Sequence, residues 1–179
     1  MKRQVLLLSL LVAYGCSDSS ELDRPVIRLE IDAAVDVPEE LDELLITLVA
    51  SRSDDGGDFC ETQGPFLIRL SSPEDLPTWI DSVQGDVYSR RLAYRVDGFV
   101  HEEEEDGGDQ VFRREGVERW PDAGQSFVRI EIEGGCYGEL CRDDRQCVDE
   151  ECARVPAPGV FDDPGMHDPG QPCELERAP

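Results

Sequence analysis

The chain has 179 residues and carries 17 Lys and Arg residues against 41 Asp and Glu residues, a formal net charge of −24 at pH 7. This charge argues against nucleic acid as a partner, because binding to phosphates requires clustered basic residues. Without its N-terminal signal and its C-terminal tail, the chain is still long enough to form one domain with a hydrophobic core.

The first residues predict an export signal that ends at a cysteine. Two basic residues precede an apolar run at residues 5–12, which is too short to span a bilayer as a permanent anchor. Small residues follow the run and lead to Gly15 and Cys16. We therefore expect residues 1–15 to form a signal peptide.

This ending resembles the lipobox of bacterial lipoproteins, in which the cysteine is acylated and becomes the first mature residue. Gly15 fits the pattern, and Tyr14 is a bulky departure from it. The resemblance implies that Cys16 carries acyl chains such as palmitate, and Ser17 after it implies sorting to the outer membrane. These chains would anchor the protein through a polar tether at residues 16–24. The alternative is an ordinary signal peptide that leaves Cys16 as a free thiol.

The next hundred residues predict short β-strands separated by Gly, Pro and Asp turns. Ile27, Leu29 and Ile31 alternate with polar residues and should share one buried face. The most apolar segment should be a central strand. In chain order, we expect strands at residues 26–31, 44–51, 66–70, 79–83, 92–100, 110–117 and 126–132.

About seven such strands predict an all-β domain over residues 25–135, a single antiparallel β-sandwich that is Ig-like or similar. After it come a cysteine-rich segment at residues 136–154 and a Pro- and Gly-rich tail at residues 155–179. We expect the tail to be mostly disordered.

Without Cys16 the chain has an even number of cysteines, which suits disulfide bonds in an exported protein. Four of them follow the last expected strand with the spacing C-x4-C-x5-C-x4-C. Zinc is the alternative, because four thiolates can form a tetrahedral site. The spacing is wider than that of paired C-x2-C motifs, and an exported location is oxidising, so disulfides are favoured. The cysteines concerned are Cys60, Cys136, Cys141, Cys147, Cys152 and Cys173.

Two disulfide pairings stay open. A crossed arrangement of the four clustered cysteines would form a compact knot and leave Cys60 for Cys173. The alternative joins Cys60 to Cys136 and ties a loop to the end of the last strand. The crossed pairs would be Cys136–Cys147 and Cys141–Cys152.

The organisation as a whole resembles a group of uncharacterised lipoproteins from GC-rich Gram-negative bacteria. They combine a lipobox and a β-sandwich with a terminal C-x4-C…C-x4-C element. The resemblance covers most of the chain and implies no catalytic residues.

The candidates for catalysis are few. A nucleophilic triad needs a histidine beside Ser or Cys and an orienting acid. The two histidines, His101 and His167, lie in an acidic turn and in the tail, and neither has a recognisable nucleophile motif nearby. We interpret both as solvated loop residues. A glycosidase-type site would need two acids across a cleft, which the sequence does not reveal.

Two acidic turns are candidates for calcium, which prefers oxygen ligands. Neither turn follows the EF-hand pattern, and a solvated, charged hairpin tip that discourages edge pairing of the sheet is the simpler interpretation. We expect no tightly bound cofactor. The candidate ligands are Asp54, Asp55 and Asp58 in one turn and Glu105, Asp106 and Asp109 in the other.

The sequence therefore predicts a non-enzymatic lipoprotein that acts as a binding or structural module of the cell envelope and contacts a protein or a glycan. The alternatives are a calcium- or carbohydrate-dependent adhesion module and a cell-wall hydrolase. Exposed aromatic residues on one sheet face would favour glycan binding, and Trp79 and Trp120 are the candidates. If both were buried, a scaffolding role would be favoured.

Overall fold

The structure is a computed structural model of the whole chain. It describes residues 24–51, 59–85, 90–101, 108–136, 138, 141, 145–149, 151–156 and 160–161, with the backbone only for residues 59–61. The expected signal peptide, Cys16 and most of the tether lie outside these residues.

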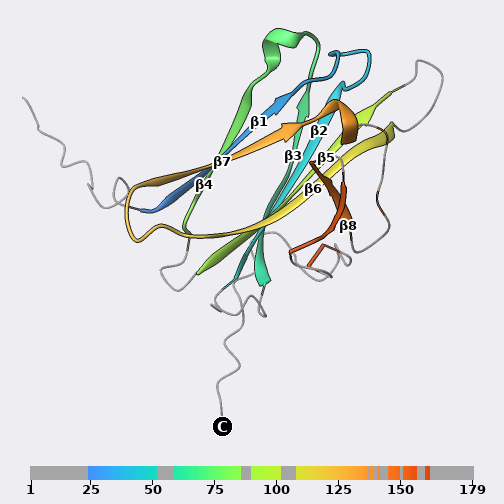
Figure 1. Cartoon of the computed structure of the whole chain (residues 1–179). Helices are drawn as coiled ribbons and strands as arrows, with labels where there is room; N and C mark the ends of the chain where they lie inside the picture. The colour runs from blue at the N-terminus through green and yellow to red at the C-terminus, as the bar shows by residue number, and fades with distance from the viewer. Residues whose placement is uncertain are drawn as a thin grey trace, which may run out of the picture.

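The domain is a β-sandwich of two sheets with a small hairpin at one end (Figure 1). One sheet has the strand order β4-β1-β7 and the other has the order β3-β2-β5-β6. The strands are β1 (Val26–Ala33), β2 (Glu43–Ser51), β3 (Phe59–Arg69), β4 (Thr78–Val83), β5 (Arg91–Val100), β6 (Asp109–Arg119) and β7 (Gln125–Ile132), followed by the hairpin of β8 (Arg145–Val148) and β9 (Glu151–Arg154).

The hydrophobic core lies between the two sheets and follows the alternation in the sequence. Ile27, Leu29 and Ile31 point inward from β1 and are fully buried, as are Ile46 and Leu48 from β2. Because side chains of a strand alternate between its two faces, this pattern leaves the intervening residues of β1 on the outer face. The predicted β-sandwich and its core face on β1 are confirmed, although the pair of β1 and β7 is parallel where antiparallel strands were expected.

Strand β1 is the middle strand of its sheet. It pairs antiparallel with β4, where Arg28 faces Asp81, and parallel with β7, where Arg28 faces Phe127. The N-terminal strand is thus enclosed by strands that come much later in the chain. This pairing brings together the outward residues of three strands that are distant in sequence.

Strand β3 differs most from the expectation. A short strand was expected at residues 66–70, but β3 extends over Phe59–Arg69 and continues through Gly64 and Pro65. Proline has no N–H for a sheet ladder, but β3 is an edge strand with β2 as its neighbour. The register shifts between Ile46 and Leu48, opposite this Gly-Pro pair, which accommodates the interruption.

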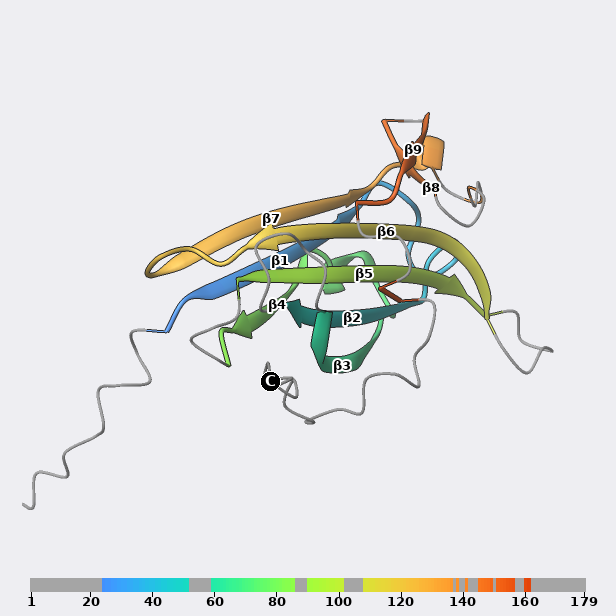
Figure 2. The same cartoon turned by 90° about the horizontal axis from the view of Figure 1, so that it is seen from below.

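The cysteine-rich segment packs against the edge strand β6 (Figure 2). Its disulfides join Cys136 to Cys147 and Cys141 to Cys152, so the crossed arrangement is confirmed. It follows that Cys136 is not joined to Cys60, and the alternative pairing is wrong. The Cys60 side chain and Cys173 lie outside the described residues.

The beginning of the tail is ordered against the domain. Val155 and Phe161 are buried, and Phe161 packs on Val49 and Ala93 of the outer face of the four-stranded sheet. The expectation that residues 155–179 are mostly disordered stays a prediction, since the structure describes only residues 155–156 and 160–161 of the tail. Residues 162–179 lie outside the described part of the chain.

Candidate functional site

The two outer faces of the sandwich differ in how they are covered. On the four-stranded sheet, Phe161 packs on the outer face and its backbone carbonyl accepts a hydrogen bond from Arg95 Nη1 at 3.3 Å. On the three-stranded sheet, every outward residue of β7 is exposed, and so are Trp79, Asp81 and Val83 of β4. The outer face of β4-β1-β7 is therefore the open face of the described domain.

Two large aromatic side chains stand on this open face. Trp79 of β4 is 59% exposed and Phe127 of β7 is 66% exposed, the highest values among the large apolar residues described. They lie on opposite sides of β1, so their strands are about 10 Å apart. Aromatic side chains without a core to fill are typical of binding surfaces.

Arg28 of β1 lies between the two rings. Its guanidinium carbon is 5.7 Å from the centre of the Trp79 ring and 5.9 Å from that of Phe127, within cation–π range of both. Arg28 also donates two hydrogen bonds to the Asp81 carboxylate, at 2.6 and 2.7 Å. The pair is bidentate, which fixes the plane of the guanidinium.

Both members of this pair are held in the charged state. The hydrogen bond between them raises the pKa of Arg28 and lowers the pKa of Asp81. Further along the face, Arg129 Nη2 lies 3.1 Å from Asp32 Oδ2 and its Nε lies 4.0 Å from Glu30 Oε1. The open face thus presents two aromatic rings, a fixed guanidinium and several carboxylates. We refer to Trp79, Arg28, Asp81 and Phe127 as the aromatic face.

The structure separates the two tryptophans that the sequence offered as candidates. Trp79 lies on the aromatic face, whereas Trp120 is 5% exposed and belongs to the hydrophobic core. Phe127 and Arg28 were not identified from the sequence. The signal for Phe127 was present, because this aromatic residue alternates with the partly buried Val128 and precedes the buried Ile130 and Ile132 on the opposite face of the same strand.

His101 forms an acid–histidine pair, and no nucleophile is found beside its ring among the residues that the structure describes. Its Nδ1 lies 2.8 Å from Asp42 Oδ1, and its backbone N–H donates to Asp42 Oδ2 at 2.8 Å. The other ring nitrogen faces Glu43 Oε1 at 3.9 Å, where a hydrolase would hold a hydroxyl or thiol. The hydrogen bond to Asp42 raises the pKa of His101, so the ring holds its proton more tightly and is less available in the neutral form that a general base requires. His167 lies outside the described residues.

The calcium candidates receive no support from the described residues. Five of the six, Asp54, Asp55, Asp58, Glu105 and Asp106, lie outside them. Asp109, which is described, is exposed at the start of β6. Within the described ranges, no group of three or more metal-binding side chains converges on a point.

Among the described residues, two carboxyls have the raised pKa that a general acid requires. Burial raises the pKa of Glu115 and of Glu118, both on β6. Glu115 Oε1 is engaged by Arg95 Nη2 at 2.7 Å, and the residue is 5% exposed. A buried, paired carboxyl has no access to a sugar chain, so Glu115 serves the fold.

A scan against protein-family models and searches of curated proteins and of solved structures find no match to the chain. In the described part of the chain, no helix has the length and apolar character needed to cross a membrane.

Proposed function

We propose that the protein is a non-enzymatic binding module of the bacterial cell envelope and that its aromatic face binds a glycan. The observation that carries the proposal is the exposure of Trp79 and Phe127 on one open sheet face, on either side of Arg28. Sugar rings have apolar C–H faces that pack on aromatic rings, and their hydroxyl groups need polar partners nearby. The aromatic face offers both.

The polar groups of the face suit an extended glycan better than a compact ligand. The face is a sheet surface, so a ligand would lie across strands β4, β1 and β7. The Arg28–Asp81 pair supplies donors and acceptors between the rings. Arg129 and Asp32 extend the polar surface beyond Phe127. A chain of sugar units could therefore contact both rings at once.

Replacing Trp79 by Ala is expected to weaken binding to envelope polysaccharide by about tenfold or more, because the ring is a central contact of the proposed site. Phe127→Ala should act in the same direction. Co-sedimentation with insoluble peptidoglycan and a glycan array would measure the effect.

Leu67→Ala provides the matched control for this test, because Leu67 is 53% exposed on β3 of the other sheet. It should bind as the unaltered protein does. Equal binding by all three variants would contradict a glycan site on this face. Failure of the unaltered protein to bind any glycan would refute the proposal itself.

The proposal includes export and a lipid anchor at Cys16, which rest on the pattern of the first sixteen residues. Cys16→Ser is expected to abolish incorporation of labelled palmitate and to release the chain from the outer-membrane fraction. Fractionation after labelling measures both. If the wild-type protein incorporates no palmitate, or if Cys16→Ser still incorporates it, the proposed lipid anchor is wrong. The proposed glycan site does not depend on that result.

A further inference from the structure

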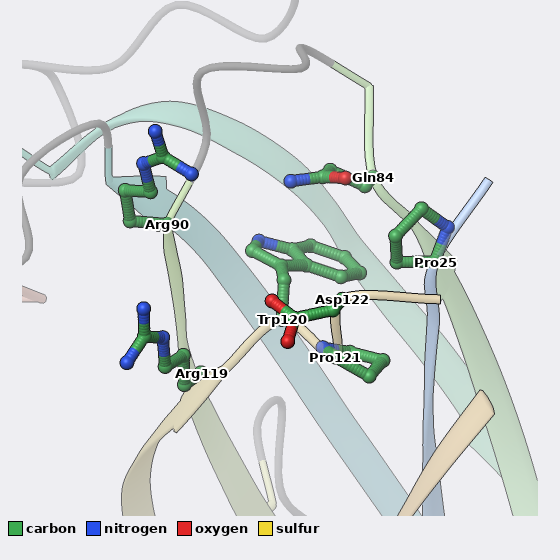
Figure 3. Close-up of a pocket in the computed structure, with 7 residues that line it drawn as sticks. All are labelled: Pro25, Gln84, Arg90, Arg119, Trp120, Pro121 and Asp122. Carbon is green, nitrogen blue, oxygen red and sulfur yellow. The ribbon is translucent and has the colours of Figure 1, made fainter. Parts of the chain in front are cut away.

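A pocket of about 160 Å³ lies at the end of the sandwich where β1 begins, around Trp120 (Figure 3). Backbone hydrogen bonds fix its walls. Trp120 N–H donates to Arg90 O at 3.1 Å, and Gln84 N–H donates to Pro25 O at 2.9 Å. The pocket thus joins the ends of strands from both sheets. Its volume is similar to that of the engineered cavity of about 150 Å³ that binds benzene.

The Trp120 indole N–H is a buried donor without a hydrogen-bond partner in the described structure. The residue is 5% exposed and its side chain lines the pocket. Leaving such a donor unsatisfied costs about 1–3 kcal/mol, so native proteins rarely tolerate it without a partner. Figure 3 places the nitrogen on the edge of the ring that faces Arg90 and Gln84.

Two arginines complete the lining beside this donor. Arg90 and Arg119 are exposed and line the pocket, and both side chains lie on the side of it that the indole nitrogen faces (Figure 3). Within the described ranges, neither guanidinium has an ion pair or hydrogen bond, in a chain with 41 acidic residues. Asp122 is the acidic side chain of the lining and is exposed.

We propose that this pocket binds a phosphate group. An indole N–H and two guanidinium groups are all donors, and all three belong to the lining of one polar pocket that admits a small group. Guanidinium matches phosphate oxygens in bidentate geometry, and a third donor suits a ligand with more than two oxygens. A bound anion would satisfy the Trp120 indole N–H and supply Arg90 and Arg119 with a charged partner.

The phosphate can come from a soluble molecule or from a lipid headgroup. Pro25, which lines the pocket, is nine residues after Cys16, a distance of at most about 30 Å in an extended chain. With the acyl anchor of the proposed function, this end of the sandwich would be close to the membrane surface. The headgroup source rests on that anchor, whereas phosphate binding itself does not.

The test uses the full chain with Trp79→Phe, which leaves Trp120 as its single tryptophan. Titration with inorganic phosphate should change the Trp120 fluorescence in a saturable way. Arg119→Gln and Arg90→Gln should each raise the Kd by about tenfold or more, because each removes a charged donor. Arg69→Gln is the control, since its side chain is 83% exposed and it pairs with Glu43 at the end of the four-stranded sheet opposite to Arg90. Acetate should compete poorly.

The proposal is overturned if phosphate causes no saturable change, or if the two pocket variants bind like Arg69→Gln. Equal binding of acetate and phosphate would overturn the preference for phosphate. The two possible sources of the phosphate, a soluble molecule and a lipid headgroup, are distinguished with Cys16→Ser, because this variant has no acyl anchor that would itself bind vesicles. Co-sedimentation with vesicles of phosphatidylcholine plus phosphatidylglycerol, lost in Arg90→Gln/Arg119→Gln, identifies the headgroup. Phosphate binding without vesicle binding identifies a soluble ligand.

Discussion

Replacing Glu115 by Ala is expected to lower the free energy of unfolding by about 3–5 kcal/mol. Glu115 is 5% exposed, and its Oε1 lies 2.7 Å from Arg95 Nη2, whose side chain is also largely buried. Removing the carboxylate leaves the Arg95 charge buried without its partner. The charge would then be stabilised by the Phe161 ring and carbonyl alone among the contacts described. Urea unfolding followed by circular dichroism measures the loss.

The ionised pair is not itself a large source of stability. Burial raises the pKa of Glu115 above its ordinary value even though Arg95 and Arg113 act to lower it. A carboxyl with a raised pKa in the folded state binds its proton more tightly there than in the unfolded chain. Its contribution to stability is therefore fully present below the unfolded pKa and declines as the pH rises through the folded pKa. Glu115→Gln should remove this part of the pH dependence.

The exposed pair of Arg129 and Asp32 provides the control for Glu115→Ala. Asp32→Ala should change stability by at most about 1 kcal/mol, because exposed ion pairs are screened by water. The double variant Arg95→Met/Glu115→Leu should recover most of the loss, since it removes both buried charges. A loss below about 1 kcal/mol in Glu115→Ala would mean that Arg95 is not confined in a buried position.

Removing the disulfide between Cys136 and Cys147 by replacing both with Ala is expected to lower the free energy of unfolding by about 3 kcal/mol. The other disulfide joins Cys141 to Cys152 with the same sequence separation of 11, so the two loops restrict the unfolded chain equally. Cys136 and Cys147 are buried and Cys152 is exposed. The first pair should therefore cost more to remove, because it also leaves a cavity.

Unfolding in urea without reductant would compare the two double variants. Equal losses would show that loop restriction alone accounts for both bonds. Size-exclusion chromatography provides a second test, in which we expect the double variants to associate more than the unaltered protein. The segment that the disulfides hold covers the edge of β6. The Glu115 backbone N–H donates to the Gln146 side chain, and the Gly138 N–H donates to Val111 O at 2.9 Å. Freed backbone groups on an edge strand favour association between chains.

Much of the sandwich follows from local pattern. The alternation at Ile27, Leu29 and Ile31 is enough to assign a strand and its inner face, and Gly, Pro and Asp mark the turns between strands. The limits of β3 could not be read in this way. Gly64 and Pro65 normally end a strand, and only the edge position of β3 allows the ladder to continue beyond them.

The aromatic face could not be assembled from sequence because it depends on which strands are neighbours. Trp79 and Phe127 are 48 positions apart, and they share a surface only because β1 lies between β4 and β7. The ring of Trp120 shows the converse problem. Trp120 directly follows β6, where the sequence indicates a turn. Its backbone N–H donates to Arg90 O, and its side chain belongs to the core. Alternation along β7 indicates that Phe127 faces outward, but neither the position of β1 between β4 and β7 nor the burial of Trp120 leaves a periodic signal in the chain.

The central position of β1 determines how the domain would bear mechanical load. A ligand held by Trp79 and Phe127 would pull on β4 and β7, whereas an N-terminal attachment would pull on β1. The force would act along the strands as shear on six residue pairs on one side and eight on the other. Their backbone hydrogen bonds run across the direction of pull and share the load, so they would have to break together. The arrangement would resist rupture by distributing tension over a whole sheet.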